Sequence, residues 1–323
     1  MPIVPHSALP AFARLAQEGR DVAGPTSGLP TIRIGLVNLM PDAALAATDR
    51  QFIRLLSGFV AEANIEVHPF TLASEHRSSE ARSYISSYYT KQPQIEEVGV
   101  DALIITGANP THFELSDEPF WEELTRLIDW AEEDVGSTLC SCLATHAVVE
   151  HWGTAKRTRL PQKRWGVYQH ELVSDHSLLD GIEPPIEAPH SHHFDLSANQ
   201  MKDAGVNVVV SGLEAGVHMA TSDDGYSYVF FQGHPEYDDI SLLKEYKREV
   251  LRYQAGDREV YPPMPANYFD NDARGVLEEH RRLVEAARAS SSSPPEFPEN
   301  AAARRWDPVW HAQGRLIYAN WLK

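Results

Sequence analysis

The chain has 323 residues, of which 42% are hydrophobic, enough for one large α/β domain or two small ones. Its 28 Lys and Arg against 46 Asp and Glu give a net charge of −18, which disfavours binding to nucleic acids and to anionic membrane surfaces. No basic start leads into a long apolar run, and no segment approaches the roughly 18 apolar residues of a membrane span. The two cysteines, Cys140 and Cys142, are too close together for a useful disulfide. We therefore expect a cytoplasmic protein with free thiols.

The first part of the chain predicts a βαβ unit. Residues 1–30 are rich in Pro and Gly, and we expect an irregular N-terminal segment there. An apolar, β-branched run at 31–39 predicts a buried strand, and 65–70 predicts a second one. Apolar residues recur at helical spacing between them: Phe52, Leu55, Leu56, Phe59 and Val60.

The same alternation continues to about residue 152. A third strand is expected at 102–106 and a fourth at 137–141, which runs straight into Cys142 and a helix at 143–152. One face of the intervening helix is marked by Phe120, Leu124, Leu127, Ile128 and Ala131. Strands that alternate with helices at this rhythm predict a doubly wound, mostly parallel sheet of the α/β class.

Beyond residue 160 the pattern changes to shorter β-like runs separated by turns, at 165–168, 206–210 and 226–231. An amphipathic helix is expected at 240–253 and a closing helix at 316–322. The Ser- and Pro-rich stretch within 284–300 predicts a low-complexity, mobile surface insertion. The prediction is one domain over 31–323 that carries this insertion.

Cys142 is the candidate nucleophile. It falls between a strand and a helix, and open α/β sheets bind ligands beyond the carboxyl ends of their strands. A helix N-terminus offers free amides and partial positive charge, which activate a thiol and can hold an oxyanion. The alternative is that Cys142 is a small buried hydrophobe, which is how we interpret its neighbour Cys140.

His234 and Glu236 are the candidate base and its orienting partner. They follow an apolar strand and a glycine, and Pro235 forces extended geometry on His234. Residues two apart on an extended chain point the same way, so Glu236 can hold the imidazole. A Cys–His pair with an acidic partner is the arrangement that thiolate attack and later proton transfer require.

Together with flanking sequence words, these residues resemble the homoserine O-succinyltransferase/O-acetyltransferase family of methionine biosynthesis. The words occur in order from about residue 32 to the end of the sequence. They are Asn38-Leu39-Met40-Pro41, Gln51-Phe52 with Arg54-Leu55-Leu56, Thr106-Gly107-Ala108, Ser137-Thr138-Leu139, Gly166-Val167-Tyr168, Ala188-Pro189-His190-Ser191, His234-Pro235-Glu236-Tyr237-Asp238, Asn267-Tyr268-Phe269 and Asn320-Trp321-Leu322.

The resemblance implies a flavodoxin-like fold of the class I glutamine amidotransferase type. It also implies ping-pong acyl transfer from acyl-CoA to homoserine, with no bound cofactor, in a homodimer. Carried over residue by residue, it makes Cys142 the acyl acceptor, His234 the base and Glu236 its partner. It further implies an oxyanion hole that uses the amide of Leu143. The implied substrate-binding residues are Lys163, Ser191 and Arg248, the last as the clamp for the amino-acid carboxylate.

The chain departs from the family pattern at three places, which makes it a divergent member. Residues 42–49 are longer than the usual segment and lack its lysines, and Leu143 replaces a common aromatic residue. The position that distinguishes acetyl from succinyl donors is Thr111, where the family has glutamate or glycine. Acetyl-CoA and succinyl-CoA therefore both stay open as donors, and serine stays open as an acceptor. A Cys-His-Glu hydrolase of the amidotransferase type is a further alternative.

Two other features of the sequence have competing interpretations. The basic run at 156–164 is either a solvated loop or a site for the phosphates of coenzyme A, with Arg157 and Arg159 as ligands. The histidines at 190, 192 and 193 suggest a metal site, but neighbouring positions 192 and 193 face opposite ways on a strand. We therefore predict no metal. The absence of a Gly-rich phosphate loop argues against nucleotide-dependent enzymes.

Overall fold

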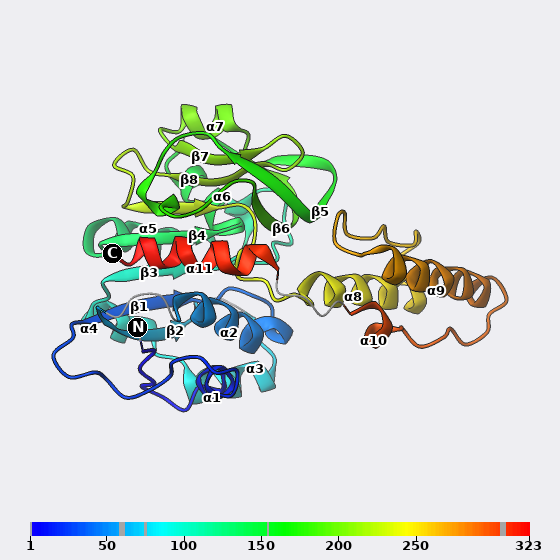
Figure 1. Cartoon of the computed structure of the whole chain (residues 1–323), viewed down its shortest axis with the longest axis horizontal. Coiled ribbons are helices and arrows are strands. Elements are labelled where there is room, and N and C mark those ends of the chain that lie inside the picture. The colour runs from blue at the N-terminus through cyan, green and yellow to red at the C-terminus, as the bar shows by residue number, and fades with distance from the viewer. Residues whose placement is uncertain (1, 58–61, 74–75, 154, 304–307) are drawn as a thin grey trace.

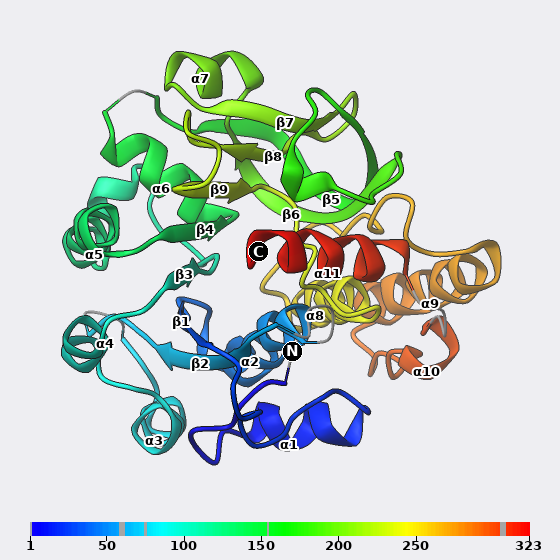
Figure 2. The ribbon, with the colours of Figure 1, turned by 60° about the vertical axis from the view of Figure 1, so that its left-hand side comes forward.

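A computed structural model describes residues 2–57, 62–73, 76–153, 155–303 and 308–323. Its centre is a nine-stranded sheet in the order β2-β1-β3-β4-β9-β8-β7-β5-β6, flanked by helices (Figures 1 and 2). No helix within these ranges is both long and apolar enough to cross a membrane.

One half of the sheet is parallel, as the sequence predicts. Its strands, in spatial order, are β2 (Asn64–Phe70), β1 (Thr31–Val37), β3 (Ala102–Ile105), β4 (Ser137–Ser141) and β9 (Tyr228–Phe231). The residues of β3 and β9 are all buried, as expected of strands covered on both faces. The α/β fold with a doubly wound, flavodoxin-like arrangement is therefore confirmed.

The other half is antiparallel and more extensive than the predicted short runs. It consists of β8 (Gly216–Thr221), β7 (Asn207–Gly212), β5 (Thr158–Leu172) and β6 (Ile186–Asp195). β5 includes most of the basic run, because it pairs along its length with β6. The sheet is thus mixed. The prediction of a mostly parallel sheet holds for β2, β1, β3, β4 and β9.

Helices cover both faces of the parallel half. Figure 2 shows α4 (Gln92–Val98), α5 (Trp121–Asp134) and α6 (Leu143–His151) on one side, and α2 (Leu45–Leu56) and α11 (Val309–Trp321) on the other. Two hydrophobic clusters, one for each face, fill the layers between helices and sheet. Two shorter helices are α3 (Ser79–Tyr88) and α7 (Ala198–Asp203). The positions Phe59 and Val60, which we placed on the second predicted helix, lie outside the described residues.

The N-terminal segment is not irregular throughout, so that expectation was wrong. Residues Pro10–Gln17 form α1, which buries Phe12 and Leu15 in the same cluster as α2. Ahead of it, the amide of Val4 donates to the carbonyl of Ile65 at 2.8 Å, which adds this part of the chain to the edge of β2. The apolar side chains of this segment were overlooked because Pro and Gly dominate its composition.

Helices α8 (Ser241–Ala255), α9 (Asn271–Ala289) and α10 (Glu299–Ala302) form an arm that extends from the sheet (Figure 1). The arm has its own hydrophobic cluster. Val284, Ala287 and Phe297, all within the expected surface insertion, are buried in it. Part of the predicted surface insertion over 284–300 is therefore packed, since its first residues are the end of α9 and Phe297 is buried, whereas residues 288–294 are exposed. The mobility of this stretch stays a prediction.

Candidate active site

Cys142 lies in the turn between β4 and α6, at the point where the sequence places it. Its backbone has a φ of 51°, a left-handed conformation that is uncommon outside glycine. The turn is fixed by the amide of Cys142, which donates to the carbonyl of Phe231 at 2.7 Å. The Cys142 side chain is partly exposed, whereas Cys140 is fully buried in the core and burial raises its pKa.

The sheet brings the other two predicted residues to this turn. β4 and β9 are parallel neighbours with Ser141 opposite Phe231, so the segments that follow them leave the sheet side by side. His234 and Glu236 lie on the segment after β9, and His234 Nδ1 and Glu236 Oε1 are 2.7 Å apart. Both side chains are buried.

The site favours the imidazolium form of His234. Burial alone would lower its pKa, but the negative charge of Glu236 and interactions with Cys142 raise the pKa of His234 to about 10. The buried neighbours His146 and His192 behave in the opposite way, because burial lowers the pKa of each. A protonated imidazole beside a thiol favours the nucleophilic thiolate.

Sequence reasoning missed Gln232, which contacts the thiol, and His146, which holds Gln232. Gln232 Nε2 lies 3.6 Å from Cys142 Sγ and donates a hydrogen bond to it. The amide oxygen of Gln232 is held by His146 Nε2 at 2.6 Å. Gln232 directly follows β9, two residues before His234, so the pairing of β4 with β9 places this donor as well as the candidate base.

Leu143 is the first residue of α6, and a backbone amide at that position has no carbonyl partner within its own helix. This amide follows Cys142 directly in the chain, and its predicted role in an oxyanion hole stays a prediction. Gly107, after β3, comes close from the opposite side, since a Cβ built on it would lie 3.6 Å from Cys142 Cβ.

Lys163 and Ser191 meet at a third residue that the sequence did not single out, Glu245 of α8. Lys163 Nζ is 3.0 Å from Glu245 Oε2, and Ser191 Oγ donates to the same oxygen at 2.6 Å. Tyr237 donates to Oε1 at 2.7 Å and stacks on the ring of His234 with 4.4 Å between ring centroids. Burial would raise the pKa of Glu245, but Lys163 and these hydrogen bonds lower it. Glu245 therefore links the implied substrate-binding side chains to the base.

Arg248 follows one helical turn after Glu245 on α8. Its side chain is 58% exposed, and its Nε lies 3.4 Å from Glu249 Oε1. It lines a hollow on the surface of α8 together with other cationic side chains. Arg248 thus lies one helical turn from Glu245, the residue that Lys163 and Ser191 contact, and its guanidinium is exposed to solvent.

Thr111 lies in the exposed loop after β3, where its hydroxyl is 3.1 Å from His112 Nδ1. The loop is held by Arg157, whose guanidinium donates to the carbonyls of His112 and Phe113 at 3.0 and 2.8 Å and lies 4.0 Å over the ring of Phe194. Arg157 is buried. The proposal that Arg157 receives coenzyme A phosphates is therefore wrong, and the residue supports the Thr111 loop instead.

The loop that carries His234 and Glu236 is held from both sides. On one side, Arg50 and Arg54 of α2 form ion pairs with Asp238, and Arg54 also donates to the carbonyl of Glu236 at 2.9 Å. On the other side, Trp310 Nε1 and His311 Nε2 of α11 lie 3.1 and 2.9 Å from the carbonyl oxygen of Tyr237. These contacts fix the loop's path independently of the reacting residues.

A cluster of buried histidines lies behind the site. His170, His190 and His218 come from three different strands, and their possible ligand atoms lie within 4.8 Å of one another, so this group could hold a metal ion. His190 Nε2 is 3.1 Å from His170 Nε2, and His170 Nδ1 is 3.1 Å from the carbonyl oxygen of Ile186, so the pair is also explained by hydrogen bonds between neutral rings. Burial lowers the pKa of all three. The absence of a metal stays a prediction.

Comparison with known proteins agrees with the resemblance in the sequence. The family model described as homoserine O-succinyltransferase matches residues 2–323. The homoserine O-succinyltransferase of Allochromatium vinosum is 50% identical over 327 residues, which cover 100% of this chain and 92% of that protein. That of Nitrosococcus oceani is 48% identical over 328 residues, covering 100% and 91%.

A solved glutamine amidotransferase from Methylobacillus flagellatus is 13% identical, covers 91% of this chain and 95% of its own, and gives a TM-score of 0.48. Because that score is below 0.5, the fold is assigned from the strand order of the sheet and not from this similarity. Neither serine acylation nor amide hydrolysis, the alternatives left open by the sequence, gains support from these relatives. The chain belongs to the homoserine O-succinyltransferase family of acyltransferases.

Proposed function

We propose that this protein transfers a succinyl group from succinyl-CoA to the hydroxyl of homoserine, through a thioester on Cys142, as a step of methionine biosynthesis. The observation that carries the proposal is the grouping of Cys142, His234 and Glu236 in a chain that the family model matches over residues 2–323. The donor is taken as succinyl because the relatives at 48–50% identity are named for that reaction.

The first half-reaction acylates the enzyme. The Cys142 thiolate attacks the thioester carbonyl of succinyl-CoA, and the amide of Leu143, at the start of α6, would stabilise the oxyanion. The carbon–sulfur bond to coenzyme A then breaks, and the departing thiolate takes the proton of the His234 imidazolium. This step leaves a neutral imidazole, and Gln232 remains beside the acylated sulfur.

The second half-reaction transfers the acyl group. Neutral His234 removes the proton from the homoserine hydroxyl as its oxygen attacks the thioester carbon, and Cys142 leaves as a thiolate. Glu236 holds Nδ1 and stabilises the imidazolium that forms again. Lys163, Ser191 and Arg248 would hold homoserine, with Arg248 on its carboxylate.

The remaining features of the proposal come from the family resemblance. Thr111 would influence the choice of acyl donor from its loop near the nucleophile. The protein is proposed to need no bound cofactor, to act in the cytoplasm and to form a homodimer. Size-exclusion chromatography with light scattering tests the last point directly.

The experiment is to incubate the protein with succinyl-CoA and to measure the intact mass. A succinyl adduct is expected, absent in Cys142→Ala and retained in the matched control Cys140→Ala, since Cys140 is a core residue. Adding homoserine should discharge the adduct with release of O-succinylhomoserine, whereas serine and water should discharge it far more slowly. Absence of an adduct, or turnover of glutamine instead, would contradict the proposal.

A further inference from the structure

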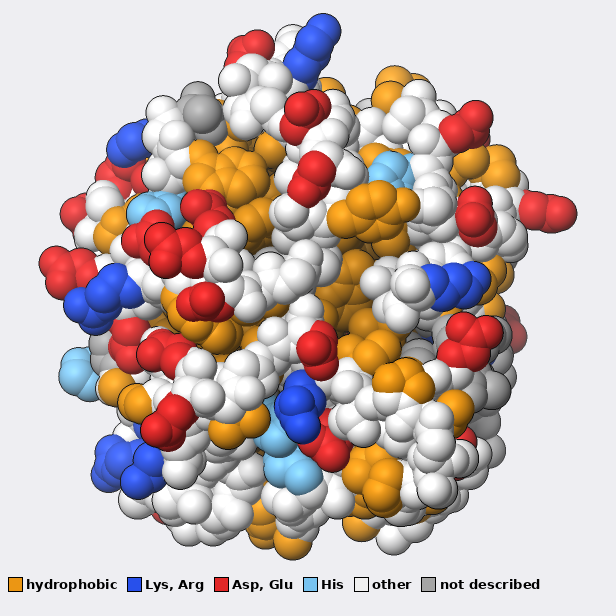
Figure 3. Space-filling model, turned by 90° about the vertical axis from the view of Figure 1, so that its left-hand side faces the viewer, with side chains coloured by type: hydrophobic (Ala, Val, Ile, Leu, Met, Phe, Trp, Pro, Cys, Tyr) orange, Lys and Arg blue, Asp and Glu red, His pale blue; other side chains and the backbone are white. Residues whose placement is uncertain are grey.

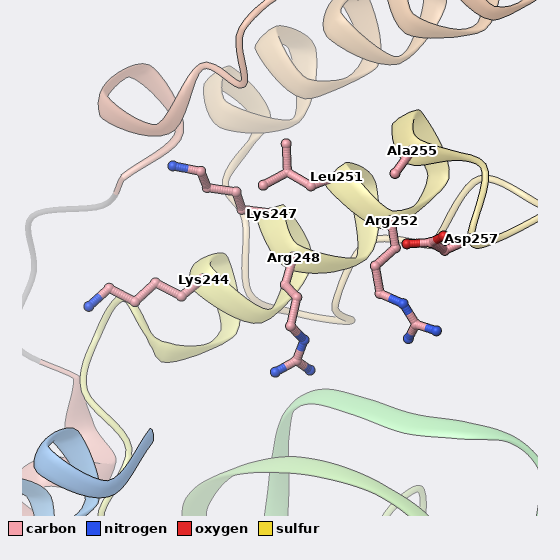
Figure 4. A pocket seen from close by; sticks show the side chains of 7 residues that line it. All are labelled: Lys244, Lys247, Arg248, Leu251, Arg252, Ala255 and Asp257. Carbon is pink, nitrogen blue, oxygen red and sulfur yellow. The ribbon is translucent and has the colours of Figure 1, made fainter. Parts of the chain in front are cut away.

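Cationic side chains gather on one surface of this acidic protein. Residues 244–252 of α8 include Lys244, Lys247, Arg248 and Arg252, which line a hollow of about 380 Å³ against one carboxylate, Asp257 (Figure 4). We refer to it as the α8 hollow. By contrast, Figure 3 shows Asp and Glu side chains spread over the face that lies away from the α8–α10 arm, with Lys and Arg scattered among them. A local surplus of positive charge is thus embedded in a chain of net charge −18.

The positive charge of the α8 hollow is available to a ligand. The side chains of Arg248 and Arg252 are 58% and 54% exposed, and Lys247 is 36% exposed. Lys247 forms an ion pair with Glu299, whereas the guanidinium groups of Arg248 and Arg252 share a single carboxylate, Glu249, with Arg258. One carboxylate cannot neutralise three guanidinium groups, so a net positive field remains at this surface.

The basic run at 156–164, which the sequence offered as the alternative, is less suited to an anion. Lys163 is paired with Glu245 and Arg164 with Asp195. Lys156 is paired with Glu114, and Arg157 is buried under the Thr111 loop. A phosphate would have to displace a carboxylate from Lys156, Lys163 or Arg164, and among the described residues of this run only Arg159 is exposed outside such a pair. In the α8 hollow Lys247 is likewise paired, with Glu299, but Lys244 is exposed and Arg248 and Arg252 share one carboxylate, so more cations are open to an anion there.

The position of the hollow relative to the site is also informative. α8 contacts the reacting groups at Glu245, which binds Tyr237, and Tyr237 stacks on His234. Arg248 and Arg252 lie three and seven residues further along the helix, roughly 4 and 10 Å along its axis. Figure 4 shows both guanidinium groups extending from α8 in the same direction, while Lys244 and Lys247 project in another. The cations of the hollow therefore flank Glu245 along α8, from Lys244 just before it to Arg252 about two helical turns after it.

Those features match one class of ligand. An acyl-CoA has its reacting thioester at one end, an apolar and flexible pantetheine arm, and a nucleotide with several phosphates at the other end. Leu251 in the hollow is 44% exposed and offers an apolar surface beside the cations, as a purine ring requires. We propose that the α8 hollow binds the phosphate groups of acyl-CoA through Lys244, Lys247 and Arg252. This proposal rests on the proposed function.

The experiment measures coenzyme A binding by calorimetry. The double variant Lys247→Ala/Arg252→Ala removes two cations from the hollow, and Arg14→Ala/Arg282→Ala removes two exposed cations elsewhere, with side chains 64% and 74% exposed. The first variant should raise the Kd for coenzyme A at least about tenfold and weaken its salt dependence, and the second should leave both unchanged. Thermal unfolding of both variants checks that they fold.

A phosphate-free donor, succinyl-pantetheine, separates this proposal from the proposed function. It should acylate Cys142 equally fast in the wild type and in the Lys247→Ala/Arg252→Ala variant. Unchanged coenzyme A affinity in that variant, or no binding of coenzyme A by the wild type, would overturn the α8 proposal even where succinyl-pantetheine acylates Cys142. Failure of both donors to acylate Cys142, with coenzyme A bound normally at the hollow, would instead refute the acyl-transfer function.

Discussion

Glu236→Gln tests the pair of buried charges on which the chemistry depends. The rise in the pKa of His234 from 6.5 to about 10 corresponds to roughly 5 kcal/mol of preference for the imidazolium, at about 1.4 kcal/mol per unit. Burial opposes this rise, and Glu236 supplies the largest of the interactions that cause it. Its replacement by a neutral amide should therefore lower the pKa of His234 by about 2 units.

The change can be measured by histidine-selective ¹⁵N NMR, with His234→Gln used to assign the signal. The titration midpoint of His234 should lie at about 8 in Glu236→Gln. The alkaline limb of the pH profile for Cys142 acylation should shift to lower pH by the same amount. Glu133→Gln, an exposed change on α5, is the matched control. An unchanged midpoint in Glu236→Gln would refute the argument that Glu236 sets the protonation of the base.

The same shift makes a prediction for stability. The folded-state pKa of His234 lies above its unfolded value, so the stabilising contribution is fully present below pH 6.5 and is lost as the pH rises through about 10. Wild type should therefore exceed Glu236→Gln by up to about 3 kcal/mol in free energy of unfolding at pH 7, and the difference should vanish above pH 10.

Other predictions concern residues outside the catalytic pair. Glu245→Gln should raise the KM for homoserine about tenfold with a smaller change in kcat, because a neutral amide no longer holds Lys163 and Ser191. An unchanged KM in steady-state kinetics would contradict this. Burial raises the pKa of Asp49 to about 6, so the stabilising contribution of its protonated form is lost as the pH rises through 6. Between pH 3.5 and 7.5, the free energy of unfolding of Asp49→Asn should therefore rise relative to that of the wild type by up to about 3 kcal/mol, measured by urea titration. An equal difference between the two proteins at both pH values would refute this. Gly166→Ala should lower the free energy of unfolding by more than about 2 kcal/mol in the same assay, because the φ of Gly166 is 152° and a Cβ would lie 2.3 Å from the carbonyl oxygen of Ala266. Gly24 has open space around it, so the control Gly24→Ala should change the free energy of unfolding little.

The positions of Cys142, His234 and Glu236 could be predicted because each depends on local sequence. An apolar run followed by a helical pattern indicates a strand-to-helix turn, and a spacing of two after Pro235 indicates side chains on one side of the chain. Neither inference requires knowledge of contacts between residues that are far apart in the sequence. Which roles these residues have stays a prediction that the adduct experiment tests.

Glu245 and Arg157 could not be found in the same way. Glu245 is one acidic residue among many on a polar helix, and its partners Lys163 and Ser191 come from strands far away in sequence. Arg157 lies in a run of charges that is typical of a solvated loop, but β5 pairs with β6 and closes over its side chain. Burial of a charged side chain is decided by tertiary packing, which composition does not reveal.

The double anchoring of the loop after β9 has a consequence for how activity arises during folding. Arg54 reaches this loop from the first βαβ unit, and Trp310 reaches it from the last helix. α11 also approaches closely, since a Cβ on Gly314 would lie 2.9 Å from Pro235. The base is therefore oriented by two segments that lie more than 250 residues apart in the chain. In a partly folded chain, even one with β4 and β9 already paired, the loop would lack one of these two anchors, so the alignment of His234 and Glu236 with Cys142 depends on both the first βαβ unit and α11 being in place.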